Sequence, residues 1–296
     1  MSVRILVVGA GLVARYVFQE KPTATQVFPL CRSDECMAQW SSLGATPVRA
    51  NLDHPASFQG LQVGWGAVFY LAPPSGLMAI DERLKWFLSN LSQSEILPRH
   101  LIYMSTTGVY GSSKGAWVTE VTPVNPESER AQRRVWAERY LRHWALKNKV
   151  SLVILRAPGI YDEERLPKEG LRMGTLPVPL LDQDPWSNHI HAHDLARMVW
   201  MAYWKGLPNR IYNACDLSQL TVGTYYELCA RYLALPAPIR LPREELRAII
   251  SPMRWSFLRE SRRIYPARVV QEWGFQWLYP TVEEFLKKRN KREQLH

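Results

Sequence analysis

The segment VRILVVGAGLVARYVFQE, residues 3–20, decides the fold class of this 296-residue chain. Its first part, Val3 to Val8, is a short apolar run rich in β-branched residues, which is typical of a strand buried in a parallel sheet. A glycine turn, Gly9 to Ala14, follows directly, and a helical pattern then runs to about Glu20. Strand, glycine turn and helix in this order predict the first unit of an α/β domain.

The same alternation continues through the first half of the chain. Apolar runs predict strands at residues 26–31, 46–49, 66–71, 101–104 and 150–155, and amphipathic patterns predict helices at residues 33–43, 79–97 and 126–147. Alternating strands and helices build a parallel sheet that is covered on both faces, with right-handed crossovers. We therefore expect an α/β fold with a doubly wound parallel sheet of the Rossmann type.

The pattern changes after residue 156. Residues 161–186 hold several prolines and glycines and are expected to form loops, whereas a strand-to-helix unit resumes at 190–205 and a strand follows at 211–214. From residue 221 the chain is mainly helical in pattern. We predict a nucleotide-binding domain of residues 1–155, completed by 187–215, and a smaller, mainly helical substrate-side domain of residues 156–186 and 216–296.

Composition excludes several classes of protein. Hydrophobic residues make up 47% and charged residues 22%, which excludes a disordered chain, and no apolar run reaches the roughly 18–20 residues of a membrane span. The net charge of +10 favours anionic partners. The basic run at residues 287–292 is interpreted as a solvated helix end, because no aromatic-basic motif accompanies it. We expect neither a nucleic acid nor a membrane as partner.

The chain has four cysteines, Cys31, Cys36, Cys215 and Cys229. They are too few for a disulfide framework in a chain of this length, and none forms a CxxC pair. Reduced thiols in a cytoplasmic protein are the expectation.

The glycine turn has the form G-x-G-x-x-A, between a strand and a helix, as a dinucleotide fingerprint requires. The first glycine permits a tight turn, the second lets the backbone approach a pyrophosphate, and the alanine allows close helix packing. The start of the helix supplies free N–H donors. The expected cofactor-binding residues of this turn are Gly9, Gly11, Leu12, Val13 and Ala14.

The end of the second predicted strand bears on the choice of cofactor. NAD-binding proteins place an acidic residue there to hold the ribose 2′-hydroxyl, whereas this chain has Arg32 and Ser33. A guanidinium can bind a 2′-phosphate through two hydrogen bonds, and a hydroxyl can add a third. We predict NADP as the cofactor. The alternative is that Arg32 is an exposed residue at a helix start and that NAD is also accepted.

The segment STTGVYG at residues 105–111 resembles the extended short-chain dehydrogenase/reductase family, which includes nucleotide-sugar epimerases and dehydratases. Three further segments carry the same resemblance, namely LRAPGIY at 155–161, IHAHDLA at 190–196 and YNA at 212–214. The resemblance covers nearly the whole chain. Within the family, atypical members of the YeeZ type, which are named as nucleoside-diphosphate-sugar epimerases, look most similar.

The resemblance implies roles for particular residues. Thr106 would hydrogen-bond a substrate oxygen, and Asp53 would contact the adenine, although Asp53 can also be explained as a loop turn residue. The remaining cofactor contacts implied by the resemblance are Leu71, Ala72, Pro73, Pro158 and Gly159.

The sequence departs from the family at its catalytic Y-x-x-x-K pair. If Glu138 matches the glutamate that follows the family's lysine, the pair falls on Arg130 and Arg134. Arginine stays protonated at neutral pH and cannot readily serve as a general base. Two arginines four residues apart on one helix face suit binding an anion better than moving a proton. Alternatively, both are solvated or paired with Glu127 and Glu138.

Two other groups of residues are candidates for chemistry. Tyr110 and Lys114 form a literal Y-x-x-x-K, but they lie in a Gly/Ser-rich loop, so Tyr110 is only a secondary catalytic candidate. His189, His191 and His193 would share one face of a strand, which raises the question of a metal site. The resemblance accounts for His191 without a metal, and we predict none.

These patterns leave two hypotheses for function. The first is an NADP-dependent oxidoreductase or epimerase that acts on a nucleotide sugar or a similar small anionic substrate with a noncanonical active site. The second is a non-catalytic NADP-binding redox sensor or scaffold. A homodimer is compatible with either.

Overall fold

The computed structural model describes residues 2–61, 64–76 and 80–293. The chain divides into two compact units. The first unit consists of Met1–Val109, Glu129–Arg156 and Leu195–Tyr212, and the second consists of Tyr110–Ser128, Ala157–Asp194 and Asn213–His296.

A seven-stranded sheet with the order β12-β7-β5-β4-β1-β2-β3 forms the centre of the first unit. β1 pairs in parallel with β2 on one side and with β4 on the other, and the strand order reverses at β1. This is the doubly wound Rossmann arrangement that the sequence predicts. The strands are β1 (Val3–Val8), β2 (Thr25–Cys31), β3 (Val48–Arg49), β4 (Ala67–Tyr70), β5 (His100–Thr106), β7 (Ser151–Ala157) and β12 (Arg210–Asn213).

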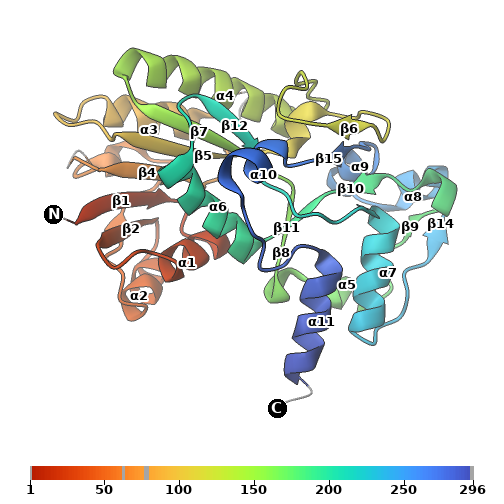
Figure 1. The fold of residues 1–296 in the computed structure, drawn as a ribbon. Coiled ribbons are helices and arrows are strands. Elements are labelled where there is room, and N and C mark those ends of the chain that lie inside the picture. The colour runs from red at the N-terminus through yellow and green to blue at the C-terminus, as the bar shows by residue number, and fades with distance from the viewer. Residues whose placement is uncertain (1, 62–63, 77–79, 294–296) are drawn as a thin grey trace. The chain divides into compact units, whose positions relative to one another are not determined.

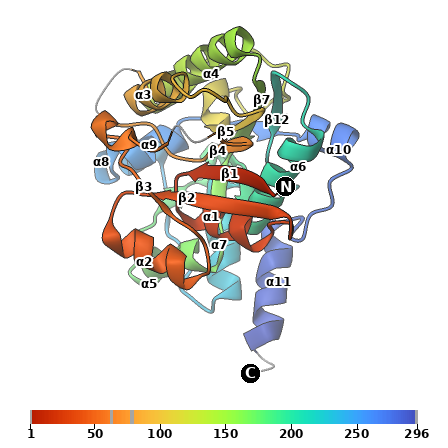
Figure 2. The ribbon, with the colours of Figure 1, turned by 90° about the vertical axis from the view of Figure 1, so that its left-hand side faces the viewer.

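Helices cover both faces of this sheet (Figures 1 and 2). On one face lie α3 (Glu82–Leu91) and α4 (Glu129–Asn148), and on the other lie α1 (Leu12–Gln19) and α6 (Ala192–Lys205). The side chains of β1 alternate between the two faces of the sheet. Leu6 and Val8 pack on one face, in the core with Leu88 of α3 and Leu141 of α4. On the opposite face the indole of Trp200 donates a hydrogen bond to the carbonyl of Val17.

Two helices of the first unit are shorter than the sequence patterns predict. The helix expected over residues 79–97 ends at Leu91, and its expected start at residue 79 lies outside the described residues. The helix ends where the hydroxyl of Ser92 donates a hydrogen bond to the carbonyl of Leu88. The helix expected from residue 126 begins at Glu129.

The second unit joins helices through small two-stranded sheets. β8 (Gly159–Tyr161) pairs with β11 (His189–His191), β9 (Val178–Pro179) with β14 (Arg240–Leu241), β10 (Trp186–Ser187) with β13 (Leu220–Thr221), and β6 (Trp117–Val118) with β15 (Arg263–Ile264). Its helices are α5 (Lys168–Arg172), α7 (Val222–Tyr232), α8 (Arg243–Ile249), α9 (Pro252–Leu258), α10 (Ala267–Trp273) and α11 (Val282–Glu293). Because β6 pairs with β15, residues 110–128 belong to this unit. The sequence predicts these residues, and residues 187–194 and 213–215, in the nucleotide-binding domain, but all of them lie in the second unit.

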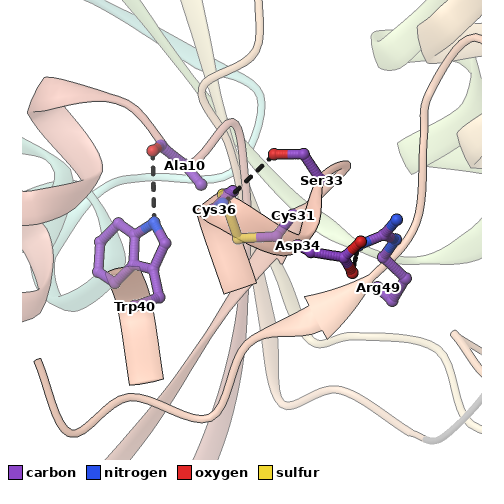
Figure 3. The surroundings of a disulfide bond; sticks show 7 residues. All are labelled: Ala10, Cys31, Ser33, Asp34, Cys36, Trp40 and Arg49. Carbon is purple, nitrogen blue, oxygen red and sulfur yellow. Dashed lines mark hydrogen bonds and ion pairs between the residues drawn. A yellow bond between two sulfur atoms is a disulfide. The ribbon is translucent and has the colours of Figure 1, made fainter. Parts of the chain in front are cut away.

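The expectation of four reduced thiols is wrong for Cys31 and Cys36, which form a disulfide (Figure 3). Cys31 ends β2, and Cys36 lies in the first turn of α2 (Asp34–Ser42), so the strand-to-helix turn brings their Cα atoms to 5.6 Å. That separation is typical of a disulfide. Cys215 and Cys229 are free and buried.

The described part of the chain contains no helix with the length and apolar character that crossing a membrane requires.

Candidate functional site

Gly9 opens the glycine turn in a conformation that only glycine adopts easily. Its φ is +106°, and a Cβ there would lie 2.6 Å from the backbone nitrogen of Ala72. Ala72 follows β4 and was expected to line the cofactor. Gly9 is therefore required by the protein itself, because the turn after β1 packs directly on the segment after β4.

Gly11 is different, because nothing in the described part of the protein requires a glycine there. It is the N-cap of α1, with an ordinary φ of −96°, and a Cβ there would meet no described atom within 4 Å. A backbone kept bare at the start of a helix, where free N–H groups gather, fits the approach of a pyrophosphate. This part of the structure is a suitable cradle for a dinucleotide.

The turn after β2 presents Arg32 and Ser33 at the same edge of the sheet. Arg32 is exposed, and no hydrogen bond or ion pair joins it to another described residue. Ser33 caps α2, because its hydroxyl oxygen accepts the backbone N–H of Cys36. Its own proton is still available to a ligand. The indole of Trp40 on α2 donates to the carbonyl of Ala10, so this helix is tied to the glycine turn (Figure 3).

Asp53 follows β3 and carries an ion pair that the sequence did not reveal. Its two carboxylate oxygens accept from Nε and Nη2 of Arg83 at 2.7 and 2.6 Å. The hydrogen bond from Arg83 lowers the pKa of Asp53, so the carboxylate is ionised at neutral pH. Arg83 also donates to the carbonyl of Pro73 at 3.3 Å. Arg83 thus joins the expected adenine contact to the segment that is expected to line the cofactor.

Arg134, which the resemblance places at the family's lysine, lies on α4 with its guanidinium buried. Nη1 donates to the hydroxyl of Tyr103 at 2.8 Å and to the carbonyl of Ala72 at 3.5 Å. Burial raises the pKa of Tyr103 to about 12, although Arg134 opposes this, so the phenol stays protonated at neutral pH. Arg134 therefore supports the segment after β4. Arg130, one turn earlier, is exposed.

A buried ion pair fixes the rotation of α4 against the sheet. Nη2 and Nε of Arg156 on β7 donate to Glu138 at 2.6 and 3.0 Å, and the hydroxyl of Ser105 donates to the same carboxylate at 2.6 Å. Both charged side chains are almost fully buried. Glu138 is thus committed to Arg156, which leaves Arg134, one turn away, facing Tyr103 on β5.

Thr106 comes directly before a short 3-10 turn, and Tyr110 is the last residue of that turn. Thr106 ends β5, is half-buried and accepts the backbone N–H of Gly108 at 3.2 Å, while its own hydroxyl proton can still be donated. Tyr110 is buried, and its hydroxyl donates to Oδ1 of Asn213 at 2.8 Å. Lys114 lies in a loop with a φ of +53°. The literal Y-x-x-x-K is therefore not on an α-helix.

The histidines do not form a three-member row on a strand. His189 and His191 lie on β11, whereas His193 belongs to α6. Burial lowers the pKa of both strand histidines to about 3, so both are neutral. Within residues 2–61, 64–76 and 80–293, no three His, Cys, Asp or Glu side chains are grouped to hold a metal ion. Gly159 begins β8, and the nicotinamide contact expected of Pro158 and Gly159 stays a prediction.

A buried carboxyl in the second unit predicts a pH effect on stability. Oδ1 of Asp216 accepts the backbone N–H of Ser218 at 2.9 Å, and burial raises the pKa of Asp216 from 3.8 to about 7. Between pH 3.8 and about 7 the folded protein therefore keeps a proton that the unfolded chain releases. The free energy of unfolding falls as the pH rises through this range and levels off above it. Denaturant unfolding at a series of pH values should show a flatter dependence for Asp216→Asn than for the wild type. Parallel curves for the two proteins would contradict the assignment.

A model of the NAD dependent epimerase/dehydratase family matches residues 5–215. The chain belongs to this family. The matched range spans most of β1, the glycine turn, β5 and α4. No curated protein sequence shows a significant match to the chain.

Solved structures share the fold of this family member over almost its full length. A conserved protein of unknown function from Silicibacter pomeroyi superposes with a TM-score of 0.80 at 24% identity, covering 98% of this chain and 99% of that one. A dTDP-glucose 4,6-dehydratase from Bacillus anthracis, in complex with NAD, gives 0.77 at 15% identity, covering 100% and 97%. A UDP-glucose 4-epimerase from Thermotoga maritima, with UDP-glucose, gives 0.75 at 17% identity, covering 99% and 100%.

Family and geometry agree on the class of cofactor. The glycine turn and the segment after β4 form the frame that a nicotinamide nucleotide occupies in this fold, and the family is NAD-dependent. The cofactor of this chain is therefore a nicotinamide nucleotide. The narrower likeness to the YeeZ type stays a prediction.

Proposed function

We propose that the chain is an NADP-dependent oxidoreductase or epimerase that acts on a nucleotide sugar or a similar small anionic molecule. The observation that carries the choice of NADP is the exposed guanidinium of Arg32 beside the capped start of α2, which makes no hydrogen bond or ion pair to another described residue. A 2′-phosphate placed there would meet this guanidinium, the Ser33 hydroxyl and the helix N-terminus.

Nicotinamide nucleotide, once bound, supplies the hydride acceptor or donor, and the residues of this chain bind and orient. Gly11 leaves room for the pyrophosphate, Asp53 and Arg83 border the adenine side, and Thr106 offers a hydroxyl to a substrate oxygen. Two of the structures that share the fold support a nucleotide sugar as substrate, since they are an epimerase with UDP-glucose and a dTDP-glucose dehydratase.

NADPH should bind more tightly than NADH, and Arg32→Ala should remove most of that difference. Loss of a charge-assisted hydrogen bond costs about 1.5–3 kcal/mol, which corresponds to roughly 10- to 150-fold in affinity. Fluorescence titration of both nucleotides measures the effect.

Lys147→Ala is the matched control, because it removes one charge at the C-terminal end of α4, where the chain turns into the start of β7. It should leave both affinities unchanged. Equal titration curves for NADPH and NADH with the wild-type protein would contradict the predicted preference for NADP.

A second function, a non-catalytic NADP-binding sensor or scaffold, is favoured by one observation. Arg134 directs its guanidinium at Tyr103 and the Ala72 carbonyl, so it braces the cofactor-lining segment. Arginine does not give up its proton at neutral pH, and Tyr103, with a pKa of about 12, does not either. Proton transfer by the Tyr/Lys pair of the family has no counterpart at these positions.

Turnover separates the two functions. Purified protein is supplied with NADPH or NADP⁺ and with UDP-glucose or dTDP-glucose, and nicotinamide absorbance and sugar products are followed. An enzyme should turn over one of these substrates, and Thr106→Val should slow it by about tenfold or more, since a hydrogen bond to the substrate oxygen is lost.

The non-catalytic function predicts no turnover by the wild type. In that case the double variant Arg130→Tyr with Arg134→Lys, which restores the family pair, should gain hydride transfer, because positioned acid–base groups are worth about 10²–10⁴-fold. Rapid wild-type turnover that is insensitive to Arg134→Ala would rule the non-catalytic function out.

A further inference from the structure

The turn that carries Arg32 and Ser33 is closed covalently. Cys31 precedes these two residues and Cys36 follows them, so the disulfide encloses the segment expected to bind the 2′-phosphate. Any role of this disulfide in cofactor binding rests on the proposed function, in which NADP binds at this turn.

The two sulfurs come from differently placed residues. Cys31 is the last residue of β2 and is fully buried, whereas Cys36 lies half-buried in the first turn of α2. The backbone N–H of Cys36 donates to the Ser33 hydroxyl, so the N-cap and the disulfide hold the same helical turn. Only the Cys36 side of the bond lies near the surface.

The far side of α2 is held to the glycine turn. Trp40 donates from its indole to the Ala10 carbonyl at 3.4 Å (Figure 3). Its ring also packs edge-on against Phe18 of α1. Ala10 lies between the two glycines of the pyrophosphate turn. The disulfide therefore ties the Arg32 turn to α2, and Trp40 ties α2 to the glycine turn.

We propose that Cys31 and Cys36 form a reversible redox site that sets the affinity of the protein for NADPH. The disulfide form holds the turn, and with it the backbone from which Arg32 projects, in a binding geometry. In the dithiol form the closure is lost, and the first turn of α2 is held by the Ser33 cap and by the ion pair of Asp34 with Arg49. Ordering this turn then becomes part of the cost of binding.

The reaction is thiol–disulfide exchange with an external dithiol. A thiolate of the dithiol attacks Sγ of Cys36, the bond between the two cysteines breaks, and Cys31 leaves with the electron pair and takes a proton. The second thiol of the reductant then attacks the mixed disulfide and releases Cys36 as a thiol. Two electrons and two protons pass to the protein, and the dithiol becomes a disulfide. A low-molecular-weight disulfide reverses the reaction, and NADPH takes part only as a ligand.

The redox chemistry itself is tested by counting thiols. The untreated protein, alkylated under denaturing conditions and weighed by mass spectrometry, should show two free thiols, and after native treatment with a dithiol it should show four. Removal of the dithiol and addition of a small disulfide should restore two. Four thiols in the untreated protein, or two after native reduction, would overturn the proposal.

The coupling to the ligand is tested by titrating NADPH and NADH into both forms. Reduction should weaken NADPH binding by about two- to tenfold, the effect of freeing one ordered side chain, and should change NADH binding less. Cys36→Ser should bind NADPH as the reduced wild type does and should not respond to the dithiol. Cys215→Ser is the control that keeps the response, since a serine hydroxyl can replace the Cys215 thiol as donor to the Ile264 carbonyl.

The outcomes distinguish the redox site from the NADP binding on which it rests. If the oxidised and the reduced protein prefer NADPH over NADH to the same extent, the redox proposal is overturned and the NADP preference stands. Equal affinity for NADPH and NADH in both forms overturns the NADP preference, and the redox proposal with it. Tighter NADPH binding after reduction also contradicts the proposal, because the disulfide would then hold the turn in a non-binding geometry.

Discussion

Gly11→Ser should leave the fold intact and weaken binding of the nicotinamide nucleotide by about 10- to 100-fold. The Cβ of the new residue meets no described atom within 4 Å, φ is −96°, and serine is a favoured N-cap, so the free energy of unfolding should change little. The side chain instead takes the space through which a pyrophosphate reaches the backbone. Calorimetric titration with NADPH and thermal unfolding of the same samples measure the two effects.

Gly9→Ala should give the opposite result, with a fall in stability of about 2–4 kcal/mol. A Cβ there would press on the Ala72 backbone at 2.6 Å, and φ is +106°. Gly44→Ala is the matched control, because Gly44 also has a positive φ, +80°, but has open space around its Cβ. It should cost only about 1–2 kcal/mol. Wild-type affinity in Gly11→Ser would contradict the placement of the pyrophosphate.

The second large effect concerns the buried ion pair under α4. Arg156→Met should lower the free energy of unfolding by about 3–5 kcal/mol, because it leaves the Glu138 carboxylate buried without its cation. Denaturant unfolding at neutral pH measures the loss.

The double variant Glu138→Gln with Arg156→Met should recover most of that stability, since no uncompensated charge is left. Arg172→Met removes an exposed partner of Glu169 and should change stability by less than about 1 kcal/mol. Equal losses from Arg156→Met and Arg172→Met would show that the buried pair contributes no more than a surface pair.

The sequence was most informative where the determinants are local. Val3 to Val8, the glycine turn and the following helix are adjacent in the chain, and each indicates its own conformation, so the doubly wound sheet was predicted correctly. The segments at residues 105–111 and 190–196 placed the chain in a family that the match over residues 5–215 then confirmed. The sequence also singled out Arg134, whose guanidinium the structure places against the segment after β4.

The partners of these residues could not be predicted in the same way. Asp53 and Arg83 are 30 residues apart, and Arg134 and Tyr103 are 31 apart, so no helical or strand period relates them. Cys31 and Cys36 are close in sequence, but their pairing depends on the direction in which α2 leaves β2, which spacing alone does not give.

The sequence by itself thus determined the order of strands and helices and the dinucleotide turn, because these are fixed by residue type and local spacing, whereas the loss of the Tyr/Lys pair stays a prediction. Only the tertiary structure decided that Arg134 braces the Ala72 segment, that residues 110–128 join the second unit, and that a disulfide closes the Arg32 turn. The reason is physical, because the partners of a side chain or a thiol are set by which strand ends lie next to one another at one edge of the sheet. That meeting is set by the packing of the whole unit.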